Sequence, residues 1–454
     1  MTRAKTWLAA FALAALMLAA PVARAEPVRL SPEALARQVS QLLLAKRADL
    51  ALPLARALAQ AKPQDFTAQL LLSYAARDQG DSETAVAAGR AAWKLAQTDA
   101  QRNSAALAAA QAQSSAGHRT AAQIWLRRAY QTAPTARAQA VALRDFRYVR
   151  SRNPWTYTLD IGVSPSSNVN GGTGADTMWL FGLPFVISGD AQALSGLEMH
   201  GSLGVERTVW ENSGQIARLG VNLAGRGYRL SHEAKAQAPG ANGADYAFWA
   251  GELYLSGRMR AARPADEWDL RLVLGHNDYG GAPLSDYARL DAGRSLGFGE
   301  GRSLHLGATL ERQWRLDNAQ NSATLRTLDL EWRQSLGPGQ LSFGLKAGEV
   351  DSAARQVAHK VKGASLGYAL ARPVLGADLS VSMGYERSDF GVMPFSTDTR
   401  TDHRLTLGVG AVLRERQYMG FAPELGLGYS RNRSNSVMHD SRDLSLSLRL
   451  KSLF

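Results

Sequence analysis

The chain has 454 residues, a formal net charge of +12 and no cysteine. Without cysteine it can hold neither a disulfide framework nor a lipid attached to an N-terminal cysteine. Its composition changes sharply near residue 150, which predicts two regions of different structure behind a leader.

The first 25 residues have the pattern of a secretory signal peptide. Basic Arg3 and Lys5 precede an uncharged run that ends in the A-x-A site Ala23-Arg24-Ala25. The alternative, a membrane anchor, requires an apolar run of about 20 residues. This run is Ala-rich, shorter and followed by a processing site, so we expect cleavage after Ala25 and export of the chain.

The next region is expected to be helical throughout. Apolar residues recur at helical spacing, as in EALARQVSQLLLAKR and AAQIWLRRAYQTA. Three stretches align on Ala48, Gly80 and Gly117 with periods of 32 and 37 residues, and the helix-turn-helix repeat has about 34 residues. The pattern resembles tetratricopeptide (TPR) repeats, and a plain helical bundle is the alternative.

The positive charge is concentrated in this region, residues 26–150, which hold 17 Lys and Arg against 9 Asp and Glu. A basic helical module can steer acidic or disordered clients, although a solvated face without a partner is the commoner meaning of such charge. We do not expect nucleic acid as a partner, because no nucleic-acid motif accompanies the charge in an exported chain.

From Trp155 onward the period of the apolar residues changes from 3.6 to 2, and fourteen candidate strands follow. On the regular strands one face is apolar, as at Leu405, Leu407 and Val409, and the other is polar or small. Such alternation is typical of transmembrane strands, with lipid on one side and water on the other. We therefore predict that residues 151–454 form an all-β transmembrane barrel of about 14 antiparallel strands.

A β-sandwich would show the same alternation, so the connections decide between the two folds. Connections after odd-numbered strands are mostly long, as in SPSSNVNGGTGADTMWLFGLPFVISGDAQ and HNDYGGAPLSD, and those after even-numbered strands are short, as in GEGR and GPGQ. Outer-membrane barrels have short periplasmic turns and longer outer loops. The predicted location is the outer membrane, with residues 26–150 in the periplasm.

The last stretch, DLSLSLRLKSLF, alternates leucine with polar residues, and we expect it to close the barrel against the first strand. It also resembles the C-terminal signal by which the outer-membrane barrel insertion machinery recognises its substrates. Ser452 departs from that signal, which usually has an apolar or aromatic residue there. The expected assembly signal consists of Leu446, Leu448, Leu450 and Phe454.

No residue pattern indicates catalysis, a cofactor or a metal. The eight histidines are dispersed, and no two have the spacing of metal ligands. His276 with Asp278, and His439 with Asp440 and Ser441, are the places where an enzyme of the outer membrane would carry its residues. Each is more simply a polar loop, so we predict that the chain is not an enzyme.

Two polar stretches beside the predicted barrel seam, SPSSNVNGG and YSRNRSNSVMHDSRDLSLSLRLKSLF, resemble those of the surface lipoprotein assembly modulator (Slam) family. Members of that family have a signal peptide, a TPR-like periplasmic domain and a fourteen-stranded barrel, so the resemblance covers the whole mature chain. The alternative is that these Asn-Ser pairs only turn and cap loops.

The resemblance implies a translocon that delivers lipoproteins, or related secreted clients, to the cell surface. The candidate client-binding residues are Arg119, Arg127, Arg128, Asn168, Asn170 and Asn435. The expected partners are the client, the barrel insertion machinery and outer-membrane lipid. Two alternatives remain: a TPR-containing porin for exopolysaccharide or small solutes, and a purely structural outer-membrane protein.

Overall fold

The computed structural model describes residues 30–180, 183–261, 266–299, 301–393 and 398–454. The predicted signal peptide, residues 1–25, lies outside the described residues. The chain divides into two compact units between His118 and Arg119. Helices continue to Arg152 and the first barrel strand begins at Trp155, so the last two helices belong to the same unit as the barrel.

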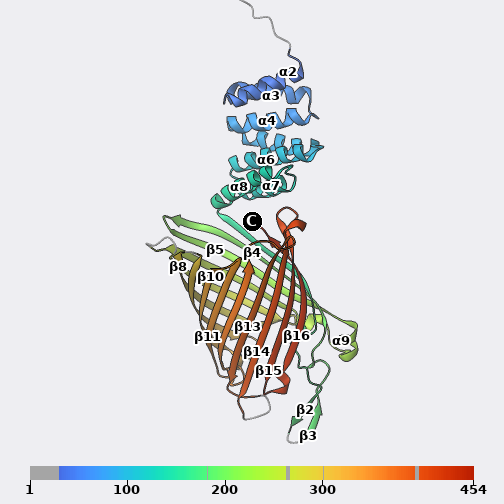
Figure 1. Ribbon diagram of the computed structural model, residues 1–454, viewed down its shortest axis with the longest axis vertical. Coiled ribbons are helices and arrows are strands. Elements are labelled where there is room, and N and C mark those ends of the chain that lie inside the picture. Colours follow the sequence, from blue (N-terminus) through green and yellow to red (C-terminus); the bar gives the residue numbers. More distant parts are fainter. Residues whose placement is uncertain (1–29, 181–182, 262–265, 300, 394–397) are drawn as a thin grey trace, which may run out of the picture. The chain divides into compact units, whose positions relative to one another are not determined.

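The first unit contains consecutive helices, and side-chain caps fix the starts of all the described ones except α3 (Figure 1). Ser31, Asp65, Asp81 and Thr98 each accept a hydrogen bond from a backbone N–H in the first turn of the helix that follows. Among the described residues, no helix combines the length and the apolar character needed to cross a membrane. The helices are α2 (Pro32–Leu44), α3 (Ala48–Ala61), α4 (Phe66–Gln79), α5 (Ser82–Leu95) and α6 (Asp99–Ser115).

Two of the three predicted inter-helix turns are confirmed. Gly80 ends α4 with φ +87°, and Gly117 follows α6 with φ +81°, a left-handed conformation that glycine adopts without steric cost. The third turn differs, because Ala48 is the first residue of α3 and Lys46 takes the positive φ in its place. Within the first unit each helix packs against the next from α2 to α6, and the TPR repeat itself stays a prediction.

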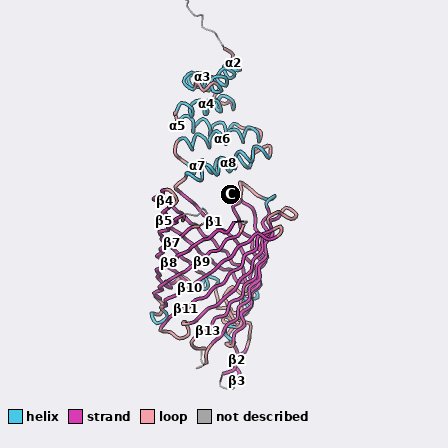
Figure 2. Tube along the Cα trace, turned by 60° about the vertical axis from the view of Figure 1, so that its left-hand side comes forward, coloured by secondary structure: helices cyan, strands magenta, loops and turns pink. Residues whose placement is uncertain are grey.

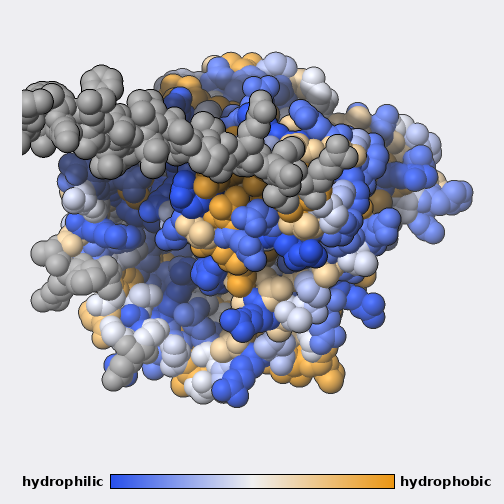
Figure 3. Space-filling view, turned by 90° about the horizontal axis from the view of Figure 1, so that it is seen from above, coloured by the Kyte–Doolittle hydropathy of each residue, from blue (hydrophilic) through white to orange (hydrophobic). Residues whose placement is uncertain are grey.

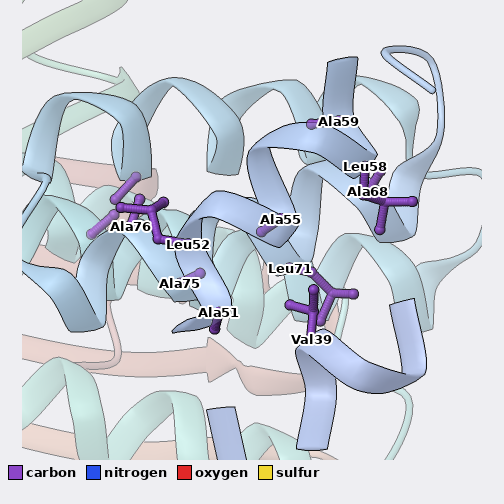
Figure 4. Packing of buried hydrophobic residues seen from close by; sticks show 12 residues of the cluster. Val39, Ala51, Leu52, Ala55, Leu58, Ala59, Ala68, Leu71, Ala75 and Ala76 are labelled. Carbon is purple, nitrogen blue, oxygen red and sulfur yellow. The ribbon is translucent and has the colours of Figure 1, made fainter. Parts of the chain in front are cut away.

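Alanine makes up most of the core of the first unit. Val39, Leu52 and Leu58 pack with a group of fully or nearly fully buried alanines (Figure 4). At Gly89 an added Cβ would lie 3.0 Å from Ala109 Cα, so the backbones of α5 and α6 touch. Small side chains permit this close approach, which explains an Ala-rich composition that still buries a continuous core.

The second unit begins with α7 (Arg119–Gln131) and α8 (Ala136–Arg152) and continues as a closed antiparallel barrel (Figure 2). Its fourteen strands are β1 (Trp155–Ser166), β4 (Gly196–Asn212), β5 (Gln215–Leu230), β6 (Phe248–Arg260), β7 (Glu267–Tyr279), β8 (Ala282–Gly299), β9 (Arg302–Arg315), β10 (Ala323–Leu336), β11 (Gly339–Ser352), β12 (His359–Leu370), β13 (Ala377–Phe390), β14 (Arg400–Leu413), β15 (Phe421–Ser434) and β16 (Ser441–Ser452). The predicted strand number and topology are confirmed.

We call the end of the barrel where α8 enters β1 the terminal end, and the opposite end the loop end. The loop end carries a separate hairpin, β2 (Thr177–Leu180) and β3 (Leu183–Val186), within the first long connection (Figure 1).

The outward face of the barrel is apolar over most of its height. Leu274 and Leu328 are 63% and 65% exposed, although leucine is normally buried in a soluble protein. Exposed tryptophans lie near both ends, with Trp155 and Trp268 at the terminal end and Trp249 at the loop end. A closed ladder of backbone hydrogen bonds, an apolar belt and two aromatic girdles make this an outer-membrane barrel.

One predicted loop is a pair of strands. The stretch HNDYGGAPLSD continues β7 and β8 to a two-residue turn, in which Gly280 and Gly281 have φ of +60° and +81°. Two consecutive positive φ angles are those of a tight hairpin turn. The polar residues extend the two strands beyond the apolar belt, so their composition resembled that of a loop. The loop-end connections 167–195, 231–247 and 391–399 are longer than every terminal-end connection, whereas 353–358 and 435–440 are no longer than 261–266 or 371–376.

The orientation of the barrel is testable with single cysteines, because the chain has none of its own. A cysteine at Lys235, in the loop-end connection 231–247, should react with a membrane-impermeant thiol reagent on intact cells. A cysteine at Pro338, in the terminal-end turn between β10 and β11, should react only after the outer membrane is opened. Both positions are exposed, so the difference reports sidedness. Labelling of Pro338→Cys alone on intact cells would reverse the orientation.

Candidate functional site

The inward face of the barrel carries a network of paired charges that we call the lumen ladder. It crosses β4 to β9 and consists of Glu206, Arg218, Glu252, Arg271, Arg289, Asp291 and Glu311. Arg289 lies at its centre and contacts Glu252 at 2.9 Å, Asp291 at 3.1 Å and Glu311 at 3.4 Å. Arg289 thus joins Asp291 on its own strand β8, Glu311 on the neighbouring β9 and Glu252 on β6, and these ion pairs fix one wall of the lumen.

Two tyrosines lie within the lumen ladder, each over a glycine. The Tyr287 hydroxyl donates to Glu252 Oε1 at 2.8 Å, and the Tyr254 hydroxyl donates to Glu206 Oε2 at 3.3 Å. An added Cβ at Gly275 would lie 2.2 Å from Tyr287 Cζ, and one at Gly220 would lie 2.3 Å from Tyr254 Cζ. The rings therefore occupy the space where a side chain would stand, which holds them flat along the wall.

The lumen wall formed by β10 to β14 is polar and mixed in charge. It bounds a cavity of about 390 Å³ whose lining includes Asp329, Glu331, Lys346, Glu386 and Arg404. Lys346 Nζ lies 3.3 Å from Glu386 Oε2. Figure 3 shows hydrophilic residues (blue) around the hollow in the lower part of the view and hydrophobic residues (orange) toward its outer edge. The lumen is therefore suited to water and polar solutes.

The three candidate asparagines all lie in loop-end connections. Asn170 Nδ2 donates to the carbonyls of Asp190 and Gln192, and its Oδ1 accepts from the backbone of Gly172 and Leu194. Asn168 Nδ2 donates to the Gly172 carbonyl.

Asn435 bonds to Thr401 N and Thr399 O. The structure thus uses all three asparagine amides to hold loops, and their client binding stays a prediction.

The two histidine stretches considered for catalysis also have structural contacts. His276 Nδ1 lies 2.7 Å from Asp286, and Asp440 forms an ion pair with Arg431 at 2.7 Å. Among the described residues, no group of three or more His, Asp or Glu has the arrangement of a metal site.

His439 is the centre of a half-buried cluster at the loop end. Its Nε2 accepts from the Arg400 guanidinium at 2.7 Å, and its Nδ1 lies 3.0 Å from Ser436 Oγ. An Nε2 that accepts is unprotonated, so the ring is neutral with its proton on Nδ1. Burial, and then the charge of Arg400, lower the pKa of His439 below its ordinary value.

The terminal end holds a second cluster, which we call the Phe454 cage. The Phe454 ring lies 4.8 Å from that of Tyr130 in α7 and 5.0 Å from that of Phe146 in α8, measured between centroids. Arg127 lies 4.6 Å from the centre of the Phe454 ring, and its guanidinium donates to the carbonyls of Phe454 at 2.8 Å and Met419 at 2.9 Å. Burial lowers the pKa of Arg127 to about 10, which leaves it charged at neutral pH.

The cage changes the interpretation of the last strand. Leu446, Leu448 and Leu450 are exposed on the outward face, where the alternation placed them. Phe454 instead points into the cage and does not continue the lipid-facing row. Arg127 is likewise occupied by the barrel, while Arg119 begins α7 and Arg128 lies 4.4 Å from the centre of the Trp125 ring. The contribution of these residues to insertion and to client binding remains a prediction.

The basic charge of the helical region gathers in α7 and α8, which together contain eight arginines and one acidic residue, Asp145. Three of these arginines, Arg147, Arg150 and Arg152, line a cavity of about 550 Å³ with Thr156 and the end of the barrel wall. We call this space the basic cavity. Its lining also includes Glu211, and Glu206 and Arg218, which pair with each other at 3.3 Å, so four arginines face two glutamates.

No protein family model matches the sequence, and no curated protein matches it significantly. Several solved barrels are distantly similar. OccAB4 of Acinetobacter baumannii has 8% identity over 65% of this chain and 97% of that chain, with a TM-score of 0.37. An anion-selective porin from Comamonas acidovorans has 11% identity over 66% and 99%, with a TM-score of 0.33. A bacterial polysaccharide outer membrane secretin has 10% identity over 65% and 98%, with a TM-score of 0.35. At this distance the likenesses carry no argument about function, and the closed fourteen-strand topology itself establishes the barrel.

Acid should loosen the loop-end cluster. Because the pKa of His439 is lower in the folded state, the unfolded loop binds more protons once the pH falls below about 6.5, and the stability of the folded loop declines from there. Amide exchange of residues 435–440 should be faster at pH 5 than at pH 7.5, and His439→Gln should remove most of the difference. Equal pH dependence in the variant would show that another group titrates.

Arg127→Ala should lower the temperature at which the folded barrel loses its heat-modifiable mobility on gels. The substitution removes two charge-assisted hydrogen bonds to carbonyls and the contact with the Phe454 ring, a loss of about 2–4 kcal/mol. Arg119→Ala in the same helix is the control and should shift the midpoint little. Identical midpoints for both variants would show that the cage does not stabilise the barrel.

Proposed function

We propose that this chain is an outer-membrane translocon that carries client proteins, lipoproteins among them, from the periplasm to the cell surface. The observation that carries the proposal is the basic cavity at the terminal end. In this proposal α7, α8 and the helical hairpins of the first unit face the periplasm and receive the client there.

The charges of the basic cavity support a protein client. In the described part of the chain, no ion pair to a carboxylate is recorded for Arg147 or Arg150, in contrast to the paired arginines of the lumen ladder. Unneutralised positive charge around a cavity attracts acidic chain segments and raises their rate of association.

The helices of the first unit provide a second argument for a protein client. Stacked helical hairpins offer extended surfaces that bind peptides and proteins. The polar lumen provides a hydrated path beyond them, although a fourteen-stranded barrel lies between filled eight-stranded barrels and open sixteen-stranded porins in width. A folded client would not fit that path, so the client has to cross as an extended chain or beside the lumen.

The test is the set of proteins exposed on the cell surface. Cells that make the intact chain, or a chain lacking Glu26–Gly117, are treated with protease, and the released peptides are identified by mass spectrometry. The deletion retains α7, α8 and the cage, so the barrel should stay folded while one or more surface proteins disappear. Heat-modifiability of the barrel in the same samples checks that it is folded.

A charge reversal separates recruitment from folding. Arg147→Glu with Arg150→Glu should reduce the same surface proteins, whereas Arg137→Glu with Arg144→Glu changes α8 by the same charge outside the cavity and should not. An unchanged surface in both the deletion and the first double variant would refute the translocon. If uptake or leakage of small solutes then depends on the chain, the porin is the better description.

A further inference from the structure

The barrel seam between β1 and β16 is paired over only part of its length. The seam pairs are Gly162 with Arg449, Val163 with Leu448, and Ser166 with Ser445, all in the half of β1 nearer the loop end. On its other edge β1 pairs with β4 along its whole length, from Trp155 to Ser166. The stretch Trp155–Ile161, which we call the β1 edge, is therefore paired on one side only.

The Phe454 cage holds the residues that would cover the middle of the β1 edge. The seam pairs keep a constant register, and continuing it would place Leu453 opposite Thr158 and Phe454 opposite Tyr157. Arg127 instead holds this end of the chain beside α7, because its guanidinium donates to Ser452 Oγ at 3.0 Å and to the main-chain oxygen of Phe454 at 2.8 Å. The contacts of the cage thus hold these last residues away from β1.

The β1 edge selects its occupant by chemistry. Unpaired backbone N–H and C=O groups at the depth of a membrane are costly, and only another extended strand can satisfy a row of them. Tyr157, Leu159 and Ile161 are exposed on the outward face, and the residues between them are polar. An occupant must therefore alternate apolar and polar residues. Thr156, at the start of this edge, also lines the basic cavity, which favours an acidic flank.

We propose that the β1 edge accepts, by β-augmentation, an extended segment of a client protein that alternates apolar and polar residues and is flanked by acidic residues. This inference rests on the proposed function and names the part of the client that the translocon binds. The Arg127 contacts keep the edge available, because they hold the competing end of β16 in the cage.

The test uses the purified full chain in lipid nanodiscs and a synthetic peptide, LSLSCSLSEE, whose cysteine can form a disulfide with a cysteine in the barrel. Leu159→Cys places the thiol on the β1 edge. Leu255→Cys is the matched control, since it is similarly exposed on the outward face but its strand is paired on both sides. We expect several-fold more cross-linking at Leu159→Cys.

Two further peptides test the selectivity of the edge. SSSSCLLLEE has the same composition without the alternation and should cross-link at the control level. Replacing the two glutamates of LSLSCSLSEE by glutamine should reduce capture about threefold to tenfold, as expected for the loss of two exposed ion pairs. Adding Arg147→Glu and Arg150→Glu to the Leu159→Cys variant should have an effect of the same size. The proposal would be overturned if the Leu159→Cys and Leu255→Cys variants captured the peptide LSLSCSLSEE equally. It would also be overturned if LSLSCSLSEE and SSSSCLLLEE were captured equally at Leu159→Cys.

A last experiment uses the end of the chain, Leu453 and Phe454, as an internal competitor for the β1 edge. Arg127→Ala should lower capture at Leu159→Cys, because the released end of β16 can then pair with β1, and removing Leu453 and Phe454 from that variant should restore it. Failure of this rescue would contradict the role of the cage. Peptide capture is measured on purified protein and surface delivery is measured on cells, so the two tests are independent. If delivery persists but the peptide is not captured, the proposal for the β1 edge is refuted and the translocon is not. Capture without delivery would refute the translocon alone.

Discussion

The requirement that every backbone N–H and C=O be paired within the membrane governs this structure. Fourteen strands meet it by closing on themselves, and most neighbouring strands are paired along nearly their whole length. The exception is the seam, where β1 extends beyond its pairing with β16. Helices α7 and α8 lie at this exception, because their aromatic side chains hold Phe454, two residues beyond the end of β16. The two helices thus belong to the barrel's unit and are also the end of the helical region.

The parts of the fold that the sequence predicted are those specified by local periodicity. Strand number, antiparallel order and the turns at Gly80 and Gly117 all follow from spacing and from glycine conformation. The Gly280-Gly281 hairpin was missed because β7 and β8 continue past the lipid with polar residues. Beyond the membrane both faces of a strand contact water, so the alternation that reveals a transmembrane strand disappears.

The candidate sites were less predictable, because they depend on contacts between distant residues. Arg127 and Phe454 are 327 positions apart, and no periodic pattern links a helix face to the end of a strand. Asn168, Asn170 and Asn435 are candidates because they lie in polar stretches that resemble the Slam family, and a short polar motif does not distinguish a residue that holds a loop from one that binds a client. The sequence shows the charge excess, and the structure shows that eight of its arginines lie in α7 and α8, which belong to the same unit as the barrel.

The tyrosines that lie over Gly220 and Gly275 have a consequence for the evolution of this lumen. In each pair the glycine leaves the space that the ring fills, so a larger residue at the glycine would push the ring into the pore. A smaller residue at the tyrosine would leave two carboxylates without a hydroxyl donor. Neither position is free to change alone. In relatives of this chain the two members of each pair should vary together, and a lineage that lost both rings would have a wider pore on that side.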